Sequence, residues 1–119
     1  MPFPIDEKYV KETEEKIGRI FPLWYRDKMM MDNGGEIEAF EDTWQLYPIL
    51  NRASNKLLSR TCNDVVKETE SAKGYPDFPP DAVAIAGNGT GDQLVFLPEN
   101  ERIYSDKIYV WRHDSGECD

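Results

Sequence analysis

The order in which hydrophobic periodicities follow one another along the chain constrains its fold most. Near the N-terminus, apolar residues recur at helical spacing, first over residues 10–20 and then over 23–30. The last third instead carries three aliphatic and aromatic segments bounded by turn residues: Ala82–Ala86, Gln93–Leu97 and Lys107–Arg112. Helices at the front and consecutive strands at the back predict an α+β domain, with a mostly antiparallel sheet and helices packed on one face.

Capping residues mark where the helices should begin and end. Asp6 can cap the first helix and Gly18 can end it, while Pro22 suits the first turn of the second helix. Asp64 can cap a further helix that runs to about Lys73. The stretch before Asp64 gives no clear prediction.

A β-hairpin is predicted between these helices. The paired glycines at 34 and 35 permit a sharp turn into residues 36–39, where apolar and acidic side chains alternate. A second alternating segment covers residues 44–47, and Asp42–Thr43 is the expected turn between the two strands.

Aromatic residues also indicate what covers the face of the sheet opposite the helices. In the last predicted strand, Ile108 and Val110 point to one face, and Tyr109 and Trp111 point to the other. Aromatic side chains on a face without helices need other cover. The segment Gly74–Pro80 is too short and too aromatic for a flexible linker, so we expect it to pack against the core.

Length and charge limit the classes of function. The 119 residues fit a single domain, 1–119, and the net charge of −9 disfavours binding to nucleic-acid phosphates or anionic membranes. The N-terminus does not resemble a signal peptide and no apolar run could span a bilayer, so we expect a cytoplasmic protein. Cys62 and Cys118 are expected to be free thiols.

No motif for a catalytic centre, metal site or cofactor stands out. The glycines at 87, 89 and 91 do not match a dinucleotide-binding loop, because Asp92 and a strand follow where a glycine and a helix are required. His113 is the only histidine, so a zinc site is not expected, and we interpret it as a surface residue at a strand end. We predict no catalytic, metal or cofactor residues.

The tryptophans and the acidic residues each allow two interpretations. Trp24, Trp44 and Trp111 are core residues or interface anchors, with core packing favoured. Among Met29–Met31, one or two should fill the core while Met31 is exposed. The many carboxylates form either a solvated surface or a patch complementary to a basic partner.

Several short motifs, taken in order, resemble the SUKH superfamily. They are Phe21-Pro22-Leu23-Trp24-Tyr25, Asn33-Gly34-Gly35, Trp44-Gln45-Leu46-Tyr47-Pro48, Gly91-Asp92 and Tyr109-Val110-Trp111-Arg112-His113-Asp114. The correspondence runs from about Ile17 to Glu117. This superfamily includes the fungal Smi/Knr cell-wall assembly regulators and many bacterial immunity proteins.

The resemblance implies an α+β fold and a non-enzymatic binding module to which no catalytic residue carries over. The matched positions are signature residues with structural roles: Pro22, Tyr25, Gly34, Gly35, Trp44, Gly91, Asp92 and Trp111. The surface that faces a toxin differs among such proteins, so the resemblance supplies no contact residues.

Charge and resemblance together predict an immunity protein that binds and neutralises a bacterial polymorphic or contact-dependent toxin. A nuclease is the expected class of toxin, because its basic groove complements an acidic domain. The alternative is an intracellular scaffold of the cell-wall assembly regulator type, and a small carboxylate-dependent hydrolase is the third interpretation. We expect a monomer or a weak dimer. The predicted contact residues are Glu36, Glu38, Glu41 and Asp42 first, and Glu99, Glu101 and Asp114 second.

Overall fold

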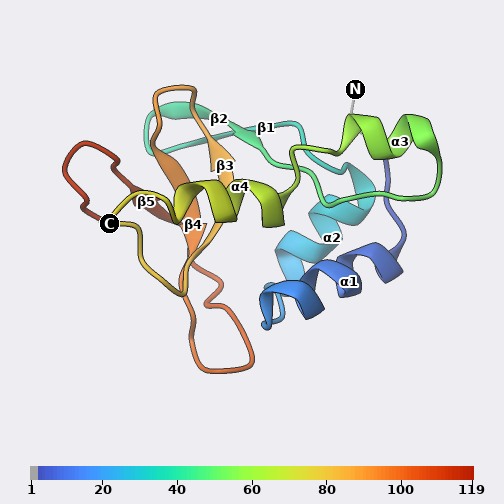
Figure 1. Cartoon of the computed structure of the whole chain (residues 1–119), viewed down its shortest axis with the longest axis horizontal. Coiled ribbons are helices and arrows are strands. Elements are labelled where there is room, and N and C mark those ends of the chain that lie inside the picture. The colour runs from blue at the N-terminus through green and yellow to red at the C-terminus, as the bar shows by residue number, and fades with distance from the viewer. Residues whose placement is uncertain (1–2) are drawn as a thin grey trace.

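The computed structural model describes residues 3–119 and has an α+β architecture (Figure 1). Within these residues the helices are α1 (Glu7–Ile17), α2 (Leu23–Met31), α3 (Asn55–Arg60) and α4 (Val65–Ala72). The strands are β1 (Glu36–Ala39), β2 (Asp42–Leu46), β3 (Val83–Gly87), β4 (Gln93–Phe96) and β5 (Tyr109–Trp111). They form one antiparallel sheet in the order β1-β2-β3-β4-β5, which confirms the predicted fold class.

The first two helices begin and end close to the predicted residues. The Asp6 carboxylate accepts a hydrogen bond from the Lys8 N–H at 3.0 Å and so caps α1. Gly18 ends α1 with a φ of +85°, a conformation that glycine adopts without strain. Pro22 lies at the N-cap position, one residue before α2 and not within its first turn.

The later helices differ in how clearly the sequence marks them. As predicted, the Asp64 carboxylate caps α4, where it accepts hydrogen bonds from the N–H groups of Val66 and Lys67. The helix ends at Ala72, one residue before the predicted end. Helix α3 was not predicted. It is short and buries no residue, so it lacks the apolar stripe that would mark it.

The β1–β2 hairpin is confirmed, but its turn lies two residues earlier than expected. Ala39 pairs with Asp42, which leaves Phe40 and Glu41 as the turn residues, with φ values of 53° and 61°. Asp42 and Thr43 begin β2 instead. Two-residue hairpin turns with positive φ at both positions usually contain Asn or Gly. Because Phe and Glu occupy them here, the sequence does not signal the turn.

Helices α1 and α2 bury one face of the sheet together with the start of α4, whose Val65 belongs to the same core. This main core contains Tyr9 and Val10 of α1, Tyr25 and Met29 of α2, and inward-facing strand residues, among them Trp44, Val83, Ile85, Leu94, Phe96 and Val110. Met29 is buried and Met31 is 72% exposed, as predicted. Trp24 differs from the other two tryptophans because its side chain stays 41% exposed on α2.

Part of the opposite face is covered by the connector that follows α4. Trp111 is fully buried there, with the rings of Tyr75 and Phe78 at centroid distances of 5.4 and 5.2 Å. Its indole N–H donates to the Asp77 carbonyl at 3.2 Å. The connector therefore packs on the core as predicted, and Tyr109 and Trp111 face this side while Val110 faces the main core.

The strands of the last third are slightly displaced or shorter than predicted. β3 starts and ends one residue later than expected, and β4 ends one residue earlier. β5 has three residues, because the chain before it turns back on the end of β4, where the Ser105 N–H donates to the Leu97 carbonyl.

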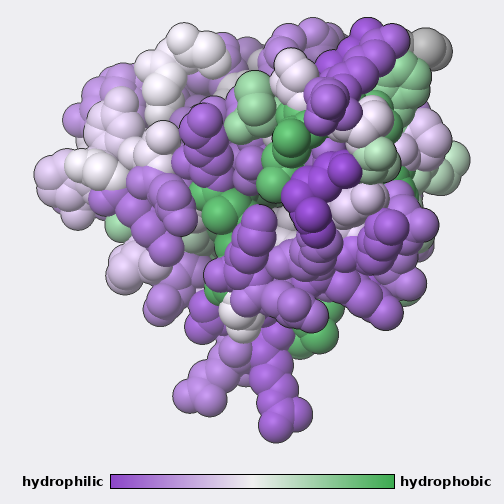
Figure 2. Space-filling model, turned by 45° about the vertical axis from the view of Figure 1, so that its right-hand side comes forward, coloured by the Kyte–Doolittle hydropathy of each residue, from purple (hydrophilic) through white to green (hydrophobic). Residues whose placement is uncertain are grey.

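The surface is mainly polar. Figure 2 shows hydrophilic side chains over most of the visible face, with hydrophobic groups in the gaps between them. Within residues 3–119, no helix is both long and apolar enough to cross a membrane. Cys62 and Cys118 are free, as predicted, and burial raises the pKa of the Cys118 thiol.

Candidate partner-binding site

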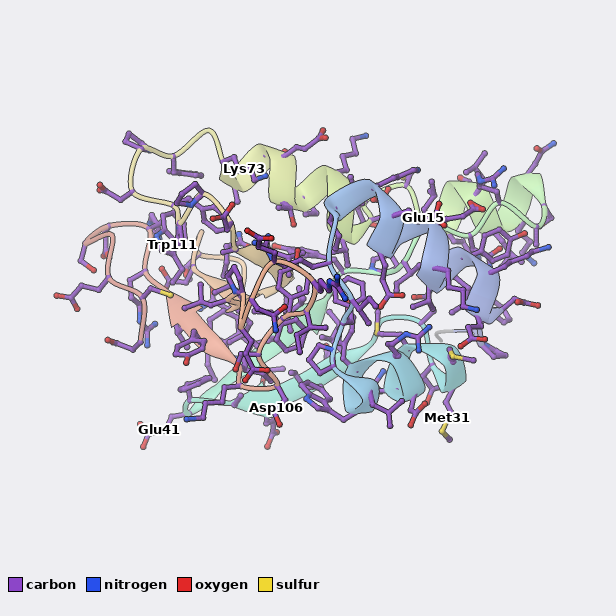
Figure 3. All side chains as sticks on the ribbon, turned by 90° about the horizontal axis from the view of Figure 1, so that it is seen from below. Glu15, Met31, Glu41, Lys73, Asp106 and Trp111 are labelled. Atoms are coloured by element: carbon purple, nitrogen blue, oxygen red, sulfur yellow. The ribbon has the colours of Figure 1, made fainter. Side chains whose placement is uncertain are left out.

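Four carboxylates lie together on the β1–β2 hairpin, and we call them the hairpin acids: Glu36, Glu38, Glu41 and Asp42. Because side chains alternate along a strand, Ile37 and Ala39 contact the main core while Glu36 and Glu38 point to the opposite, uncovered face. All four hairpin acids are exposed. Figure 3 shows Glu41 projecting at one end of the molecule, with Met31 at the other end.

Hydrogen bonds hold one of the hairpin acids, Asp42, in place at the turn. Asp42 accepts hydrogen bonds from the Thr43 N–H and from the Asn88 side-chain amide, both at 2.8 Å. The second bond ties the hairpin to the β3–β4 turn, which lies beside it in Figure 1. Positive φ at Phe40 and Glu41 costs roughly 1–2 kcal/mol for each residue. Strained backbone of this kind is concentrated at functional sites.

The turn also forms a shallow acidic depression of about 480 Å³, lined by Glu38, Ala39, Glu41, Asp42 and Thr43. No basic residue contributes to this lining. Among residues 3–119, none of the ion pairs involves a hairpin acid. Three carboxylates without a neighbouring cation therefore give this end of the molecule a negative potential.

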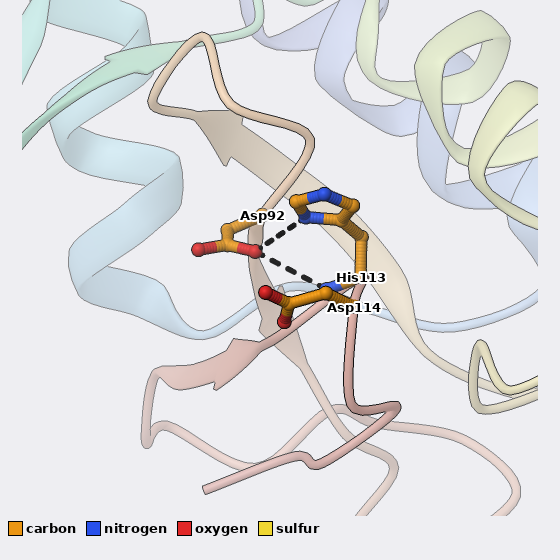
Figure 4. Close-up of side chains that lie close together, drawn as sticks. All are labelled: Asp92, His113 and Asp114. Atoms are coloured by element: carbon orange, nitrogen blue, oxygen red, sulfur yellow. Dashed lines mark hydrogen bonds and ion pairs between the residues drawn. The ribbon is translucent and has the colours of Figure 1, made fainter.

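One more carboxylate, that of Asp92, lies at the β3–β4 turn, and its charge is paired. The Asp92 carboxylate contacts the Arg112 guanidinium at 3.0 Å and the His113 Nδ1 at 2.7 Å, and it accepts the His113 backbone N–H at 3.1 Å (Figure 4). Burial tends to raise the pKa of Asp92, but these hydrogen bonds and the Arg112 charge outweigh it and lower that pKa overall. We call this group the Asp92 clamp.

The Asp92 clamp explains two residues that the sequence placed only approximately. Gly91 has a φ of +104°, and a Cβ on it would lie 3.0 Å from the His113 ring, so glycine leaves room for the imidazole. His113 is half-buried against this turn, not simply a surface residue at a strand end. The clamp fastens the chain after β5 to the β3–β4 turn.

Asp92, His113 and Asp114 offer three ligand atoms within 4.8 Å of one another, a spacing that could hold a metal ion. However, one Asp92 oxygen is engaged by His113 and the other by Arg112. A fixed guanidinium at the same carboxylate repels a cation. The arrangement therefore suits an ion-pair network better than a metal centre.

The structure separates the remaining predicted contacts. In an antiparallel sheet, the β1–β2 turn, the β3–β4 turn and the end of β5 lie at the same end of the sheet, so Asp114 shares that end with the hairpin acids. The loop after β4 carries Glu99 and Glu101, which we call the loop acids, and this loop lies at the opposite end of the sheet (Figure 1). Glu101 lines a cavity of about 650 Å³ beside Arg19 and Arg102.

That cavity also contains the one buried carboxylate of α1. Glu14 accepts a hydrogen bond from the Phe21 N–H at 2.7 Å and pairs with the Arg26 Nε at 3.3 Å. Burial raises the pKa of Glu14, and the Phe21 bond and Arg26 charge only partly oppose this. Both contacts are made by the same Glu14 oxygen, so this carboxylate joins α1 to the start of α2.

Sequence reasoning missed one contact that depends on strand register, the hydrogen bond between the side chains of Asn88 and Asp42. Asn-Gly at 88–89 signalled a turn, but which residue it would contact depends on pairing between distant strands. The alternation of Glu36 and Glu38 around Ile37 was the visible signal for an edge strand with one polar face.

Comparison with known proteins identifies the family. A model of the SMI1 / KNR4 family (SUKH-1) matches residues 4–119. Searches of the curated proteins and of the solved structures give no significant match. Members of this family are generally non-enzymatic immunity or regulatory proteins. The match covers nearly the whole chain and agrees with the resemblance of the sequence motifs, so the protein belongs to the SMI1 / KNR4 family (SUKH-1).

Proposed function

We propose that this protein is an immunity protein that binds a bacterial toxin domain through the hairpin acids and blocks its active site or substrate groove. The observation that supports this best is the group of exposed, unpaired carboxylates at the strained hairpin turn. Asp92, which lies at the same end of the sheet, is instead paired with Arg112 and His113.

A nuclease is the class of toxin that this surface complements best. Nucleases bind phosphates through basic grooves, and an acidic protein can compete for such a groove. The net charge of −9 would also accelerate the encounter by long-range attraction, which salt screens over about 8 Å at physiological ionic strength. Binding should therefore weaken as salt is added.

A regulatory scaffold of the cell-wall assembly type is the second candidate, and a different surface favours it. Helix α2 exposes Leu23, Trp24 and Met31, of which Leu23 and Met31 are 69% and 72% exposed. Large apolar side chains on the surface often anchor protein partners. A partner that docks there would bind with little dependence on salt.

The experiment compares two charge reversals of equal size. The tagged protein and its variants are co-expressed with toxin domains encoded by neighbouring genes, and both capture and growth rescue are measured. Glu38→Lys/Glu41→Lys changes the proposed surface, while Glu99→Lys/Glu101→Lys changes the loop acids by the same charge.

We expect the hairpin variant to weaken toxin binding about tenfold or more and to lose growth rescue at low toxin excess, since close interfacial charge pairs contribute about 1.5 kcal/mol or more. The loop variant should slow association slightly and keep rescue. A larger loss in the loop variant would move the contact to Glu99 and Glu101. Capture of a signalling partner that is unaffected by either variant would favour the scaffold.

A further inference from the structure

The two edges of the sheet differ in whether their backbone groups are already paired. Beside β5, the Arg112 N–H donates to the Glu117 carbonyl at 2.8 Å, and the Asp119 N–H donates to the Val110 carbonyl at 2.9 Å. The C-terminal segment therefore covers this edge (Figure 1). Among residues 3–119, no segment pairs in this way with the outer side of β1.

The strand register shows which groups of β1 face outward. In an antiparallel pair, hydrogen-bonded and non-hydrogen-bonded positions alternate. The Leu46 N–H donates to the Gly35 carbonyl at 2.8 Å, so odd-numbered residues of 35–39 direct their backbone groups toward β2. The N–H and C=O groups of Glu36 and Glu38 then point away from β2, and no backbone group of residues 3–119 engages them.

We propose that β1 receives an extended segment of the partner protein as an additional strand, with basic residues on both sides of an apolar one. This inference rests on the proposed function and specifies how the hairpin acids are used. A residue that pairs with the outward backbone of Glu36 or Glu38 places its side chain on the same face, about 5 Å away. Lys or Arg at both positions would meet the two carboxylates. The residue between them would face the main-core side beside Ile37, where an apolar side chain fits.

A second copy of this chain is a poor occupant of the same edge. In a two-fold antiparallel arrangement centred on Ile37, Glu36 of one copy lies opposite Glu38 of the other. Like charges directly across a strand pair are destabilising. Charged side chains on an edge strand are a common means of preventing such self-pairing. The same charges favour a basic strand, so the β1 edge selects between partners.

Backbone pairing and charge would have separate roles in such a complex. Main-chain hydrogen bonds of an added strand supply affinity that depends little on sequence, while side chains on alternate positions supply specificity. Glu36 and Glu38 provide the outward N–H and C=O groups and also the carboxylates. A toxin segment with basic residues at alternate positions would pair with these backbone groups and also with the two carboxylates.

The test uses a short capped peptide of alternating lysine and valine, added to the full chain at millimolar concentration. Amide hydrogen exchange is followed by NMR at Glu36 and Glu38, with the Ile37 amide as internal control because it faces β2. The expected result is exchange about tenfold slower at Glu36 and Glu38, and little change at Ile37.

Two matched controls separate strand addition from simple charge attraction. The same peptide methylated on the backbone nitrogens that would face β1 keeps its charge but cannot donate, so it should lose the protection. Glu38→Gln should weaken the unmodified peptide, and a peptide with alternating glutamate and valine should give no protection.

The proposal is overturned if the lysine peptide gives no protection at millimolar concentration, or if the methylated peptide protects equally. Either result would leave the proposed function intact if Glu38→Lys/Glu41→Lys still weakens toxin binding about tenfold or more. The opposite result is also informative. If the peptide protects Glu36 and Glu38 but the charge-reversed variant still binds the toxin normally, β1 can accept a strand but the toxin does not use this edge.

Discussion

Acidic residues on the two sides of the sheet differ in what surrounds them. Beside β5, Asp92 is enclosed by Arg112 and His113, and the C-terminal segment pairs with the strand. At β1, the carboxylates of Glu36 and Glu38 are exposed and the outer backbone is unpaired. Asp92 is thus neutralised by its neighbours, whereas none of the ion pairs within residues 3–119 involves Glu36 or Glu38. The comparison teaches that neutralisation by neighbours, not the number of carboxylates, distinguishes a structural acid from one available to a partner.

The largest expected effect comes from the buried aromatic residue of the β5 side. Trp111→Ala should lower the free energy of unfolding by about 3–5 kcal/mol, because a fully buried side chain leaves a cavity under the connector. Phe40→Ala at the exposed hairpin turn should change it by about 0.5 kcal/mol or less. Urea denaturation followed by circular dichroism measures both. Similar losses for the two variants would contradict the division between a structural and an exposed edge.

The next effect concerns the Asp92 clamp. Asp92→Asn should lower the free energy of unfolding by about 2 kcal/mol, since it weakens charge-assisted bonds to Arg112 and His113 in a nearly buried position. Asp42→Asn at the hairpin also alters an aspartate with two hydrogen bonds, but at an exposed site, so a change of about 0.5 kcal/mol is expected.

The dependence on pH checks that assignment independently. Because the pKa of Asp92 is lowered on folding, its ionised form stabilises the fold above the ordinary range of an aspartate. This stability is lost as the pH falls through the lowered pKa. Unfolding measured between about pH 6 and pH 2 should therefore show a smaller acid-induced loss for Asp92→Asn than for the unmodified protein. Parallel curves would show that the clamp does not contribute.

Much of the fold could be predicted because local signals were strong. Asp6 and Asp64 each begin a helix by accepting a hydrogen bond from a backbone N–H two or three residues ahead, and Gly18 ends a helix through its own positive φ. Alternation along Ile108–Trp111 assigned each side chain to the correct face. The turn at Phe40–Glu41 was misplaced because its residues are unusual for that conformation, so tertiary pairing of the strands overrides local preference there.

The candidate site was only partly accessible from the sequence. The hairpin acids are adjacent along the chain, so their clustering followed from the predicted hairpin. Whether a carboxylate is neutralised depends on residues far away in sequence, as Arg112 and His113 are from Asp92. The separation of Glu99 and Glu101 from the hairpin likewise depends on which end of the sheet each loop occupies.

A smaller effect is expected at Glu14, an acid away from both edges whose pKa is shifted in the opposite direction. Because burial raises that pKa on folding, the contribution of Glu14 is fully present below the ordinary range of a glutamate and is lost as the pH rises through the raised value. Glu14→Gln should cost about 1 kcal/mol near pH 4, and less at pH 7. Gln can still accept the Phe21 N–H. A cost that grows with pH would contradict this sign.

The smallest effect tests why the β1 edge stays unpaired. Glu36→Thr/Glu38→Thr removes the like charges that would face each other in a β1–β1 pair and introduces residues that favour strands. Self-association should become a few-fold tighter, equivalent to about 1 kcal/mol, and should be detectable by sedimentation velocity at high protein concentration. Glu99→Thr/Glu101→Thr makes the same change in charge at the opposite end and should not associate. If both variants dimerise, reduced net charge is responsible. If neither does, the charges of Glu36 and Glu38 are not what keeps the edge free, and its selectivity for a basic strand would need to come from shape alone.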